Sequence, residues 1–211
     1  MKNINEKDYS DFDLSKAVAF ALRFRVPMIY GYDDMAPCKF ETVLCEHCGH
    51  SVWDKEYLVP KASVRNRKFG YLDIWKYVVD EEIRGKLIEN FDITEDDFRP
   101  VRTKSGEIVM WEIAPQHVMK PIGNVNGCKK INVCKKCGWT EYSPPKYEID
   151  DCREYYYITK EALDDMHDIN FMCEEAFGQP FATFVSRRVY DYLIERYPRM
   201  QFAPVFLKES N

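Results

Sequence analysis

The chain has 211 residues, of which 45% are hydrophobic and 15% aromatic. This content can build a core and excludes a protein that is disordered throughout. The net charge of −5 argues against a general nucleic-acid binder, because such proteins normally present a basic surface.

The first residues predict a cytoplasmic protein. Residues 1–6 are polar and lack the apolar run of a signal peptide, and the longest small-and-apolar run, 17–22, is far too short to cross a membrane. The cytoplasm is reducing, so we interpret the eight cysteines as metal ligands and free thiols rather than as a disulfide framework.

Residues 1–13 are predicted to form a loose, charged lead-in to a strand. From 19 to 26, apolar residues alternate with small or basic ones, and this period of two predicts a half-buried strand. A helix that begins at Ser15 is the competing prediction. We treat residues 1–37 as an N-terminal strand segment.

Two motifs of the form C-x-x-C-G carry the clearest chemistry in the sequence. They read CEHCG at 45–49 and CKKCG at 134–138, and the glycine of each suits a tight turn with positive φ. Four thiolates complete a tetrahedron and so form a closed, structural zinc site. We therefore predict one Zn²⁺ per chain, bound by Cys45, Cys48, Cys134 and Cys137.

Each motif leads into a short strand, at 50–53 and at 139–142, which is typical of a zinc ribbon. Its halves are predicted at 38–58 and 125–148, with 85 residues between the inner cysteines. A loop this long costs only about 1.4 kcal/mol more to close than that of a common ribbon. Structural zinc contributes roughly 10–16 kcal/mol in small peptides. The zinc-binding free energy therefore exceeds the extra cost of closing the loop. Residues 59–124 are predicted to fold as an inserted unit.

A pattern in the insert recurs near the C-terminus, at 78–101 and at 184–205. In each copy a strand ends at valine, a polar N-cap (Asp80 or Ser186) follows, and apolar residues line one helix face. The motif F-x-P-V then begins another strand, whose proline predicts an edge or a bulge. We interpret the copies as an internal repeat, with 149–211 as the C-terminal α/β repeat unit.

Three other segments complete the prediction. Residues 155–163 repeat the strand-to-helix pattern with Thr159 as the cap, and 107–113 is a hairpin strand that follows a Ser-Gly turn. Residues 120–130 are a loop that returns to the second cysteine motif. The predicted fold class is α+β, with two related strand–helix–strand units joined by a split zinc ribbon.

No catalytic constellation emerges, so we predict that the protein is not an enzyme. The signatures of zinc deaminases, zinc proteases, phosphate loops and serine hydrolases are absent from the sequence. His47 and His50 lie beside the first motif, but four thiolates already complete the site. His117 and His167 are isolated along the chain. Four cysteines have no assigned role: Cys38, Cys128, Cys152 and Cys173. Of these, Cys128 is a weak competitor as a metal ligand.

Charged clusters are the remaining surface features. Acidic residues lie between the first repeat helix and its F-x-P-V strand: Asp92, Glu95, Asp96 and Asp97. Most clusters of this kind are solvated surface, and the alternative is a surface that binds a basic partner. The basic stretch 61–68 is interpreted as a solvated loop. A nucleic-acid-binding face would need that stretch together with Lys129, Lys130, Lys135 and Lys136.

Two C-x-x-C-G motifs around an insert, with repeat helices that lead to F-x-P-V ends, resemble the bacterial double-CXXCG motif family. That family is similar to immunity proteins found beside polymorphic toxins. The resemblance covers about residues 38–207 and assigns the four motif cysteines as metal ligands. It implies a non-catalytic intracellular protein that binds and neutralises a cognate toxin, and it supplies no motif for the toxin contact.

The first hypothesis is therefore an immunity protein whose acidic balance suits a basic toxin. The alternative is a zinc-ribbon protein that associates with nucleic acid or with a nucleic-acid-processing complex. An enzyme with an unrecognised site is the third hypothesis, and a deep pocket of converging polar residues away from the cysteines would favour it.

Overall fold

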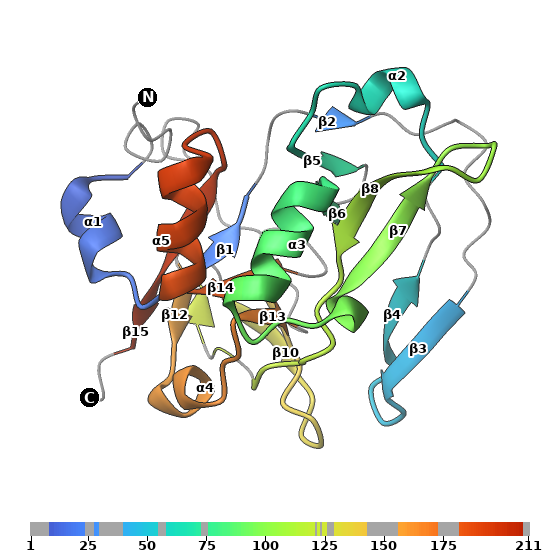
Figure 1. Ribbon diagram of the computed structural model, residues 1–211. Coiled ribbons are helices and arrows are strands. Elements are labelled where there is room, and N and C mark those ends of the chain that lie inside the picture. The colour runs from blue at the N-terminus through green and yellow to red at the C-terminus, as the bar shows by residue number, and fades with distance from the viewer. Residues whose placement is uncertain are drawn as a thin grey trace. The chain divides into compact units, whose positions relative to one another are not determined.

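The computed structural model describes residues 9–23, 28–29, 40–54, 58–72, 76–120, 122, 124–125, 129–142, 156–172 and 182–208. Both helices and strands occur, so the predicted α+β class is confirmed (Figure 1). The chain divides into two compact units. Unit 1 comprises Met1–Arg23, Pro115–Val133 and Gly138–Asn211, and unit 2 comprises Phe24–Ala114 and Cys134–Cys137.

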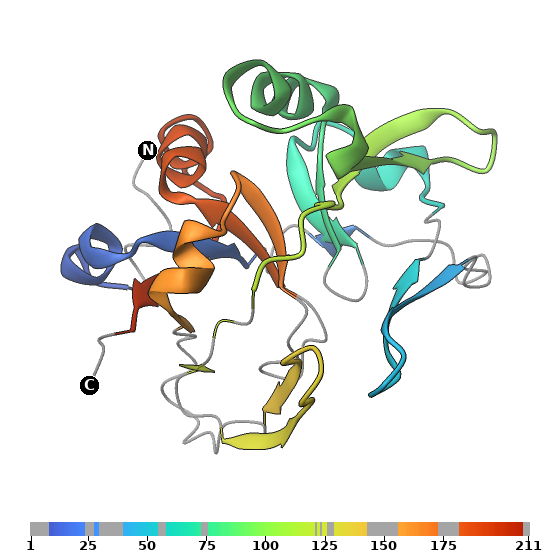
Figure 2. The same cartoon turned by 90° about the horizontal axis from the view of Figure 1, so that it is seen from below.

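Unit 1 is built on a six-stranded sheet with the order β13-β14-β1-β15-β12-β9. Its strands are β1 (Ala19–Leu22), β9 (Asn124–Val125), β12 (Tyr156–Ile158), β13 (Ile169–Met172), β14 (Ala182–Ser186) and β15 (Phe202–Leu207). Its helices are α1 (Asp11–Lys16), α4 (Lys160–Asp164) and α5 (Arg187–Arg196). Helix α5 lies on the sheet against β1 and β14 (Figures 1 and 2).

Strand β1 confirms a strand at the start of the predicted segment 19–26, but it is not half-buried. All four of its residues are buried, because β14 and β15 pair with it on either side in the middle of the sheet. The alternation in the sequence came from small alanines, which fit a buried strand as well as an exposed one. Residues 24–27 of the predicted segment lie outside the described residues.

The loose lead-in predicted for residues 1–13 is wrong over its last part, because helix α1 begins at Asp11. Ser10 caps this helix: its side chain accepts the Asp13 N–H at 3.1 Å, and its own N–H reaches the Asp13 carboxylate. This reciprocal capping box satisfies two backbone donors that would otherwise lack partners. The competing helix from Ser15 is also wrong, since α1 ends at Lys16.

Unit 2 contains a five-stranded sheet with the order β2-β5-β6-β8-β7. Its strands are β2 (Met28–Ile29), β5 (Phe69–Leu72), β6 (Lys76–Val79), β7 (Phe98–Arg102) and β8 (Ile108–Ile113). Its helical segments are α2 (Lys61–Val64), α3 (Glu81–Asn90) and the 3₁₀ turn η2 (Glu95–Asp97). A buried cluster that includes Ile29, Leu72, Val78, Val101 and Met110 forms the core of this unit.

Two hairpins carry the cysteine motifs. The first joins β3 (Phe40–Cys45) to β4 (His50–Asp54), and the second joins β10 (Lys130–Val133) to β11 (Thr140–Tyr142). The short strand expected after each glycine is thus confirmed. The loop expected at 120–130 is interrupted by β9, which pairs with β12. No helix in the described part of the chain is both long and apolar enough to span a bilayer.

The helix starts predicted from the repeat are confirmed. Asp80 accepts the Ile83 N–H at 2.9 Å and Ser186 accepts the Val189 N–H at 3.4 Å. Thr159 caps α4 in the same way. These short polar side chains take up N–H groups that the first helical turn leaves without partners. Each of the two segments in which a repeat is predicted forms a strand, a helix and a strand, as β6–α3–β7 and as β14–α5–β15.

The two F-x-P-V prolines differ in their surroundings. Pro100 lies in the edge strand β7, as predicted, whereas Pro204 lies in β15, between β1 and β12, so the edge prediction is wrong there. The Arg23 N–H donates to Gln201 O, and pairs alternate along an antiparallel ladder. The Pro204–Phe20 pair is therefore a non-hydrogen-bonded one, and pairing with β12 starts only at Val205. The missing proline N–H is tolerated at this position.

Candidate metal centre

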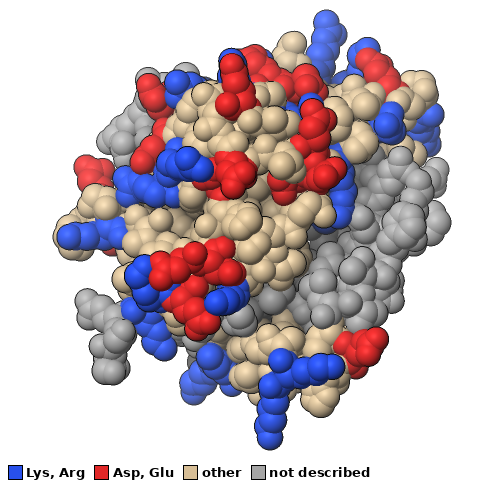
Figure 3. All heavy atoms as spheres, turned by 60° about the horizontal axis from the view of Figure 1, so that its bottom comes forward, with Lys and Arg blue, Asp and Glu red and all other residues tan. Residues whose placement is uncertain are grey.

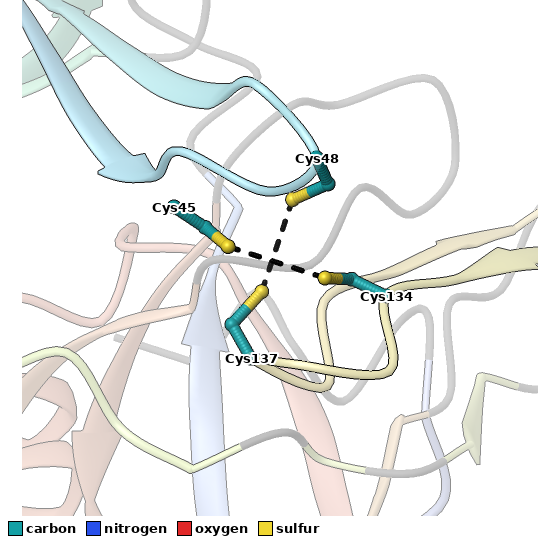
Figure 4. A group of neighbouring side chains, drawn as sticks. All are labelled: Cys45, Cys48, Cys134 and Cys137. Atoms are coloured by element: carbon teal, nitrogen blue, oxygen red, sulfur yellow. Dashed lines mark hydrogen bonds between the residues drawn. The ribbon is translucent and has the colours of Figure 1, made fainter.

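The first cysteine motif forms the turn of the β3–β4 hairpin. The Gly49 N–H donates to Cys45 O at 2.9 Å, which closes the turn. Gly49 has φ of +70°, a left-handed conformation that disfavours any residue with a Cβ. The positive φ predicted for the glycine is confirmed, and the turn directs both of its cysteines to one side (Figure 4).

The second motif has the same local geometry. It lies between β10 and β11, and Gly138 has φ of +76°. The Thr140 hydroxyl donates to Gly138 O at 3.0 Å and holds the end of the turn. Residues Cys134–Cys137 group with unit 2, which also holds Cys45 and Cys48, so all four cysteines belong to one compact unit.

The four sulfurs form a compact cluster in which every pair lies within 4.8 Å. Cys45 Sγ is 4.0 Å from Cys134 Sγ, and Cys48 Sγ is 3.9 Å from Cys137 Sγ. Figure 4 shows the two turns facing each other with their sulfurs converging. A tetrahedron of metal–sulfur bonds of about 2.3 Å has edges of about 3.8 Å. The donor set therefore fits one metal ion.

Backbone donors prepare two of the sulfurs for the thiolate state. N–H groups of Cys137 and then Lys136 point to Cys134 Sγ and, against the opposing effect of burial, lower the pKa of this thiol to about 6. In the first turn, N–H groups of Cys48 and His47 lower the pKa of Cys45. Each turn thus stabilises the negative charge of its first cysteine, which is the form that binds metal.

Other predicted ligands do not join the cluster. Within the described residues the group consists of the four cysteines, and His47 is exposed outside it. The positions Cys38, Cys128, Cys152 and Cys173 lie outside the described residues. Four sulfur donors fill a tetrahedral ion and leave no position for water or substrate.

Of the four acidic residues predicted to form a partner surface, one is buried in a structural role and three are exposed. Asp97 is buried and accepts the Thr94 N–H at 2.9 Å and the Thr94 hydroxyl at 3.0 Å, so it caps η2. Glu95 is exposed and pairs with Arg84 of α3. Asp92 and Asp96 are exposed. Three of the four carboxylates therefore reach solvent, and contact with a partner stays a prediction.

The basic residues also divide into two groups. Lys61 pairs with Glu107, and Lys68 pairs with Glu82 and Asp80, whose hydrogen bonds raise the pKa of Lys68 well above its ordinary value. Three exposed lysines at the second motif have no acidic partner within the described residues: Lys130, Lys135 and Lys136. The stretch 61–68 is not a free cationic loop, because 61–64 is helix α2.

A histidine pair was not predicted. The rings of His117 and His167 stack with centroids 3.9 Å apart and planes at 4°, and Asp165 lies 3.5 Å from His117 Nε2. The segment that contains His117 lies alongside β13, because the Phe171 N–H donates to His117 O at 2.8 Å. Fifty residues of separation hide this contact from the sequence, and each histidine looked isolated.

Comparison with known proteins adds no relative: no family model, no curated protein and no solved structure matches this chain. The functional argument therefore starts from the cysteine cluster and from the surfaces around it.

Proposed function

We propose that the chain is a non-catalytic bacterial immunity protein that binds and neutralises a cognate protein toxin in the cytoplasm. The observation that carries the proposal is the closed cluster of four sulfurs. Because four donors leave a metal ion no open position, the centre stabilises a fold rather than performing catalysis. The resemblance of the paired C-x-x-C-G motifs to the double-CXXCG family, and its similarity to immunity proteins, then favours toxin binding by a stabilised surface.

The metal is proposed to be Zn²⁺, one per chain. A tetrahedral set of four thiolates suits zinc, and the main competitor is iron. Elemental analysis of the pure protein separates the two, with one zinc and no iron as the expected result. A metal-free protein whose Cys45→Ser variant folds as well as the parent would overturn this part of the proposal.

The zinc joins hairpins that are far apart in the chain, since Cys48 and Cys137 are separated by 89 positions. We propose that this split ribbon stabilises a scaffold of two related strand–helix–strand units. Support comes from their shared order of elements, from their side-chain N-caps and from the F-x-P-V strand that ends each of them.

The toxin is proposed to be basic and to contact the acidic cluster of Asp92, Glu95, Asp96 and Asp97. Figure 3 shows acidic and basic side chains interleaved over one face rather than a field of one sign. Local clusters would then set the orientation of a partner and raise its association rate. Reversing Asp92 and Asp96 to lysine should weaken toxin binding, whereas Glu195→Lys on α5 is a matched control.

Co-expression tests the function directly. The protein encoded beside this chain is produced in bacteria with and without it, and we expect growth to be restored and the two proteins to co-purify. The Cys45→Ser variant should lose protection, because the scaffold loses its metal. Neither complex nor protection, with a toxin shown to be active, would overturn the proposal.

Nucleic-acid association is the second candidate, favoured by one observation. Lys130, Lys135 and Lys136 are exposed beside Ile131 and Val133, which are 59% and 48% exposed on β10. Lysines that bind phosphates release condensed counterions, and this gain shrinks as the salt concentration rises, so binding should weaken steeply with salt. A mobility-shift titration with single- and double-stranded DNA and RNA tests this candidate. Absence of binding at low salt, or binding unchanged in the Lys135→Glu/Lys136→Glu variant, would remove it.

A further inference from the structure

The two cysteines of each motif differ in exposure. The first of each pair, Cys45 and Cys134, is buried at 7% exposure. The second is more open: Cys48 is half-buried and Cys137 is exposed. An approaching reagent therefore meets only one sulfur of each turn.

The open sulfurs face each other across the cluster. Cys48 Sγ is 3.9 Å from Cys137 Sγ, and the buried sulfurs of Cys45 and Cys134 form the other cross-turn pair. Figure 4 shows both pairs crossing between the two turns. A disulfide has a sulfur–sulfur bond of about 2.05 Å, so the open pair must approach by about 2 Å. Both members are on turns, where side chains have more freedom to rotate than in a paired strand.

Exposure therefore singles out Cys48 and Cys137 as the sulfurs that a dissolved oxidant reaches first.

We propose that Cys48 and Cys137 are a modification site for hydroperoxides, which oxidise the pair to a cross-turn disulfide and open the metal centre. The Cys137 thiolate attacks one peroxide oxygen, the O–O bond breaks, and hydroxide leaves, giving a sulfenic acid. The Cys48 thiolate attacks that sulfur, the S–S bond forms, and a second hydroxide leaves. Two thiolates, two protons and hydrogen peroxide give one disulfide and two waters.

The disulfide removes two of the four donors, so the remaining thiolates hold an ion much more weakly. Cytoplasmic thiols keep the pair reduced at rest, and the same thiols restore it after an oxidative episode. The inference rests on the metal centre of the proposed function and not on the identity of its partner. It makes the stabilising element of the fold responsive to oxidant.

Peroxide treatment of the zinc-loaded protein tests the inference. Samples are quenched with an alkylating agent at intervals, digested without reductant and mapped by mass spectrometry, while a chromogenic chelator reports free zinc. We expect the peptide linked through Cys48 and Cys137 to appear first, with zinc release in parallel. Initial disulfides within either motif, or a Cys48–Cys137 link with zinc retained, would overturn the proposal.

Matched histidine variants test the role of exposure. Cys137→His and Cys134→His each retain four donors, since three cysteines and a histidine also form structural zinc sites. Their zinc content is measured first. Peroxide-driven zinc release should slow markedly more in Cys137→His than in Cys134→His, because accessible thiolates are the reactive ones. Equal effects would contradict the inference.

A measurement on the unmodified protein covers the case in which a variant fails to fold. Limited alkylation of the native protein should label Cys48 and Cys137 before Cys45 and Cys134. Labelling of all four at one rate would overturn the proposal. Zinc content before oxidation tests the metal of the proposed function separately, so a zinc-bound protein that fails the cross-link test overturns this inference alone.

Discussion

The segments β6–α3–β7 of unit 2 and β14–α5–β15 of unit 1 have the same local order but complete their sheets differently. In each, a third strand lies between the two outer ones and is antiparallel to both: β8 in unit 2 and β1 in unit 1. Strand β8 follows β7 directly through a turn, whereas β1 comes from the start of the chain. The position between the two outer strands can therefore be filled by a strand that comes after the segment in the chain, like β8, or before it, like β1.

The middle strands also place equivalent aromatic residues. Trp111 pairs with Val79 and Pro100 in unit 2, and Phe20 pairs with Val185 and Pro204 in unit 1. Each ring thus lies between the residue before the N-cap and the proline of F-x-P-V. The two sheets share this packing position although its residues differ.

The helix residue that covers this ring is Arg84 in α3 and Tyr190 in α5, each four positions after its N-cap. The Arg84 guanidinium carbon is 4.1 Å from the Trp111 ring centroid, and the Tyr190 ring stacks on Phe20 at 3.5 Å. Arg84 also reaches exposed carboxylates at the helix edge. The same position is filled by a cation at one site and by an aromatic ring at the other, so geometry is retained while chemistry changes.

Metal removal should give the largest difference between the units. Structural zinc contributes on the order of 10 kcal/mol of apparent binding energy in small peptides, and all four ligands belong to unit 2. A chelator should therefore abolish amide protection in β3 and β4, while β14, α5 and β15 keep theirs. Hydrogen exchange with and without chelator measures this. Equal loss in both units would mean that they unfold together.

Acid should also destabilise unit 2 more than unit 1. The pKa of the Cys134 thiol is lowered from 9.0 to about 6 by N–H groups of Cys137 and Lys136. A lowered folded-state pKa stabilises the fold fully above the unfolded value, and that contribution falls as the pH drops through about 6. The stability of the metal-free protein should therefore fall as the pH drops from about 9 to about 6. Stability that stays constant across this range in a denaturant titration would contradict the assignment.

The ring position offers a direct comparison by mutation. Tyr190 is buried and contacts both Phe20 and Phe202, so Tyr190→Ala should destabilise by about 3–5 kcal/mol through the cavity it leaves. Arg84→Ala should cost about 1–2 kcal/mol, because cation–ring contacts and partly exposed ion pairs are weaker. Denaturant unfolding measures both, with Tyr190→Phe as the control that retains the ring. Equal costs would refute the comparison.

The helix caps should give the smallest effects and the most similar ones. Asp80→Ala and Ser186→Ala should each destabilise by about 1 kcal/mol, the usual cost of a lost side-chain cap. Asp80→Asn keeps an acceptor for the Ile83 N–H and removes only the ion pair with Lys68, so its cost should be below about 0.5 kcal/mol. A larger loss for Asp80→Asn would show that the charge, not the cap, matters.

Much of the candidate site could be predicted because its determinants are local. The spacing within each C-x-x-C-G motif fixes a turn, and glycine adopts the positive φ of Gly49 and Gly138 without the steric cost of a Cβ. The caps at Asp80, Ser186 and Thr159 follow from neighbours three residues away. Helix α1 was missed although Ser10 and Asp13 carried a capping signal, because six residues give too little periodicity to notice.

From the sequence alone, the cysteine turns, the starts of the principal helices and the strands beside each motif could be predicted, since these depend on contacts within a few residues. Tertiary structure decided which strand fills the middle of each sheet, how Pro204 is accommodated at an interior position, and which sulfurs are open. It also brought His117 onto His167. These features depend on burial and on pairing between distant segments, where the free energy comes from neighbours that no local pattern encodes.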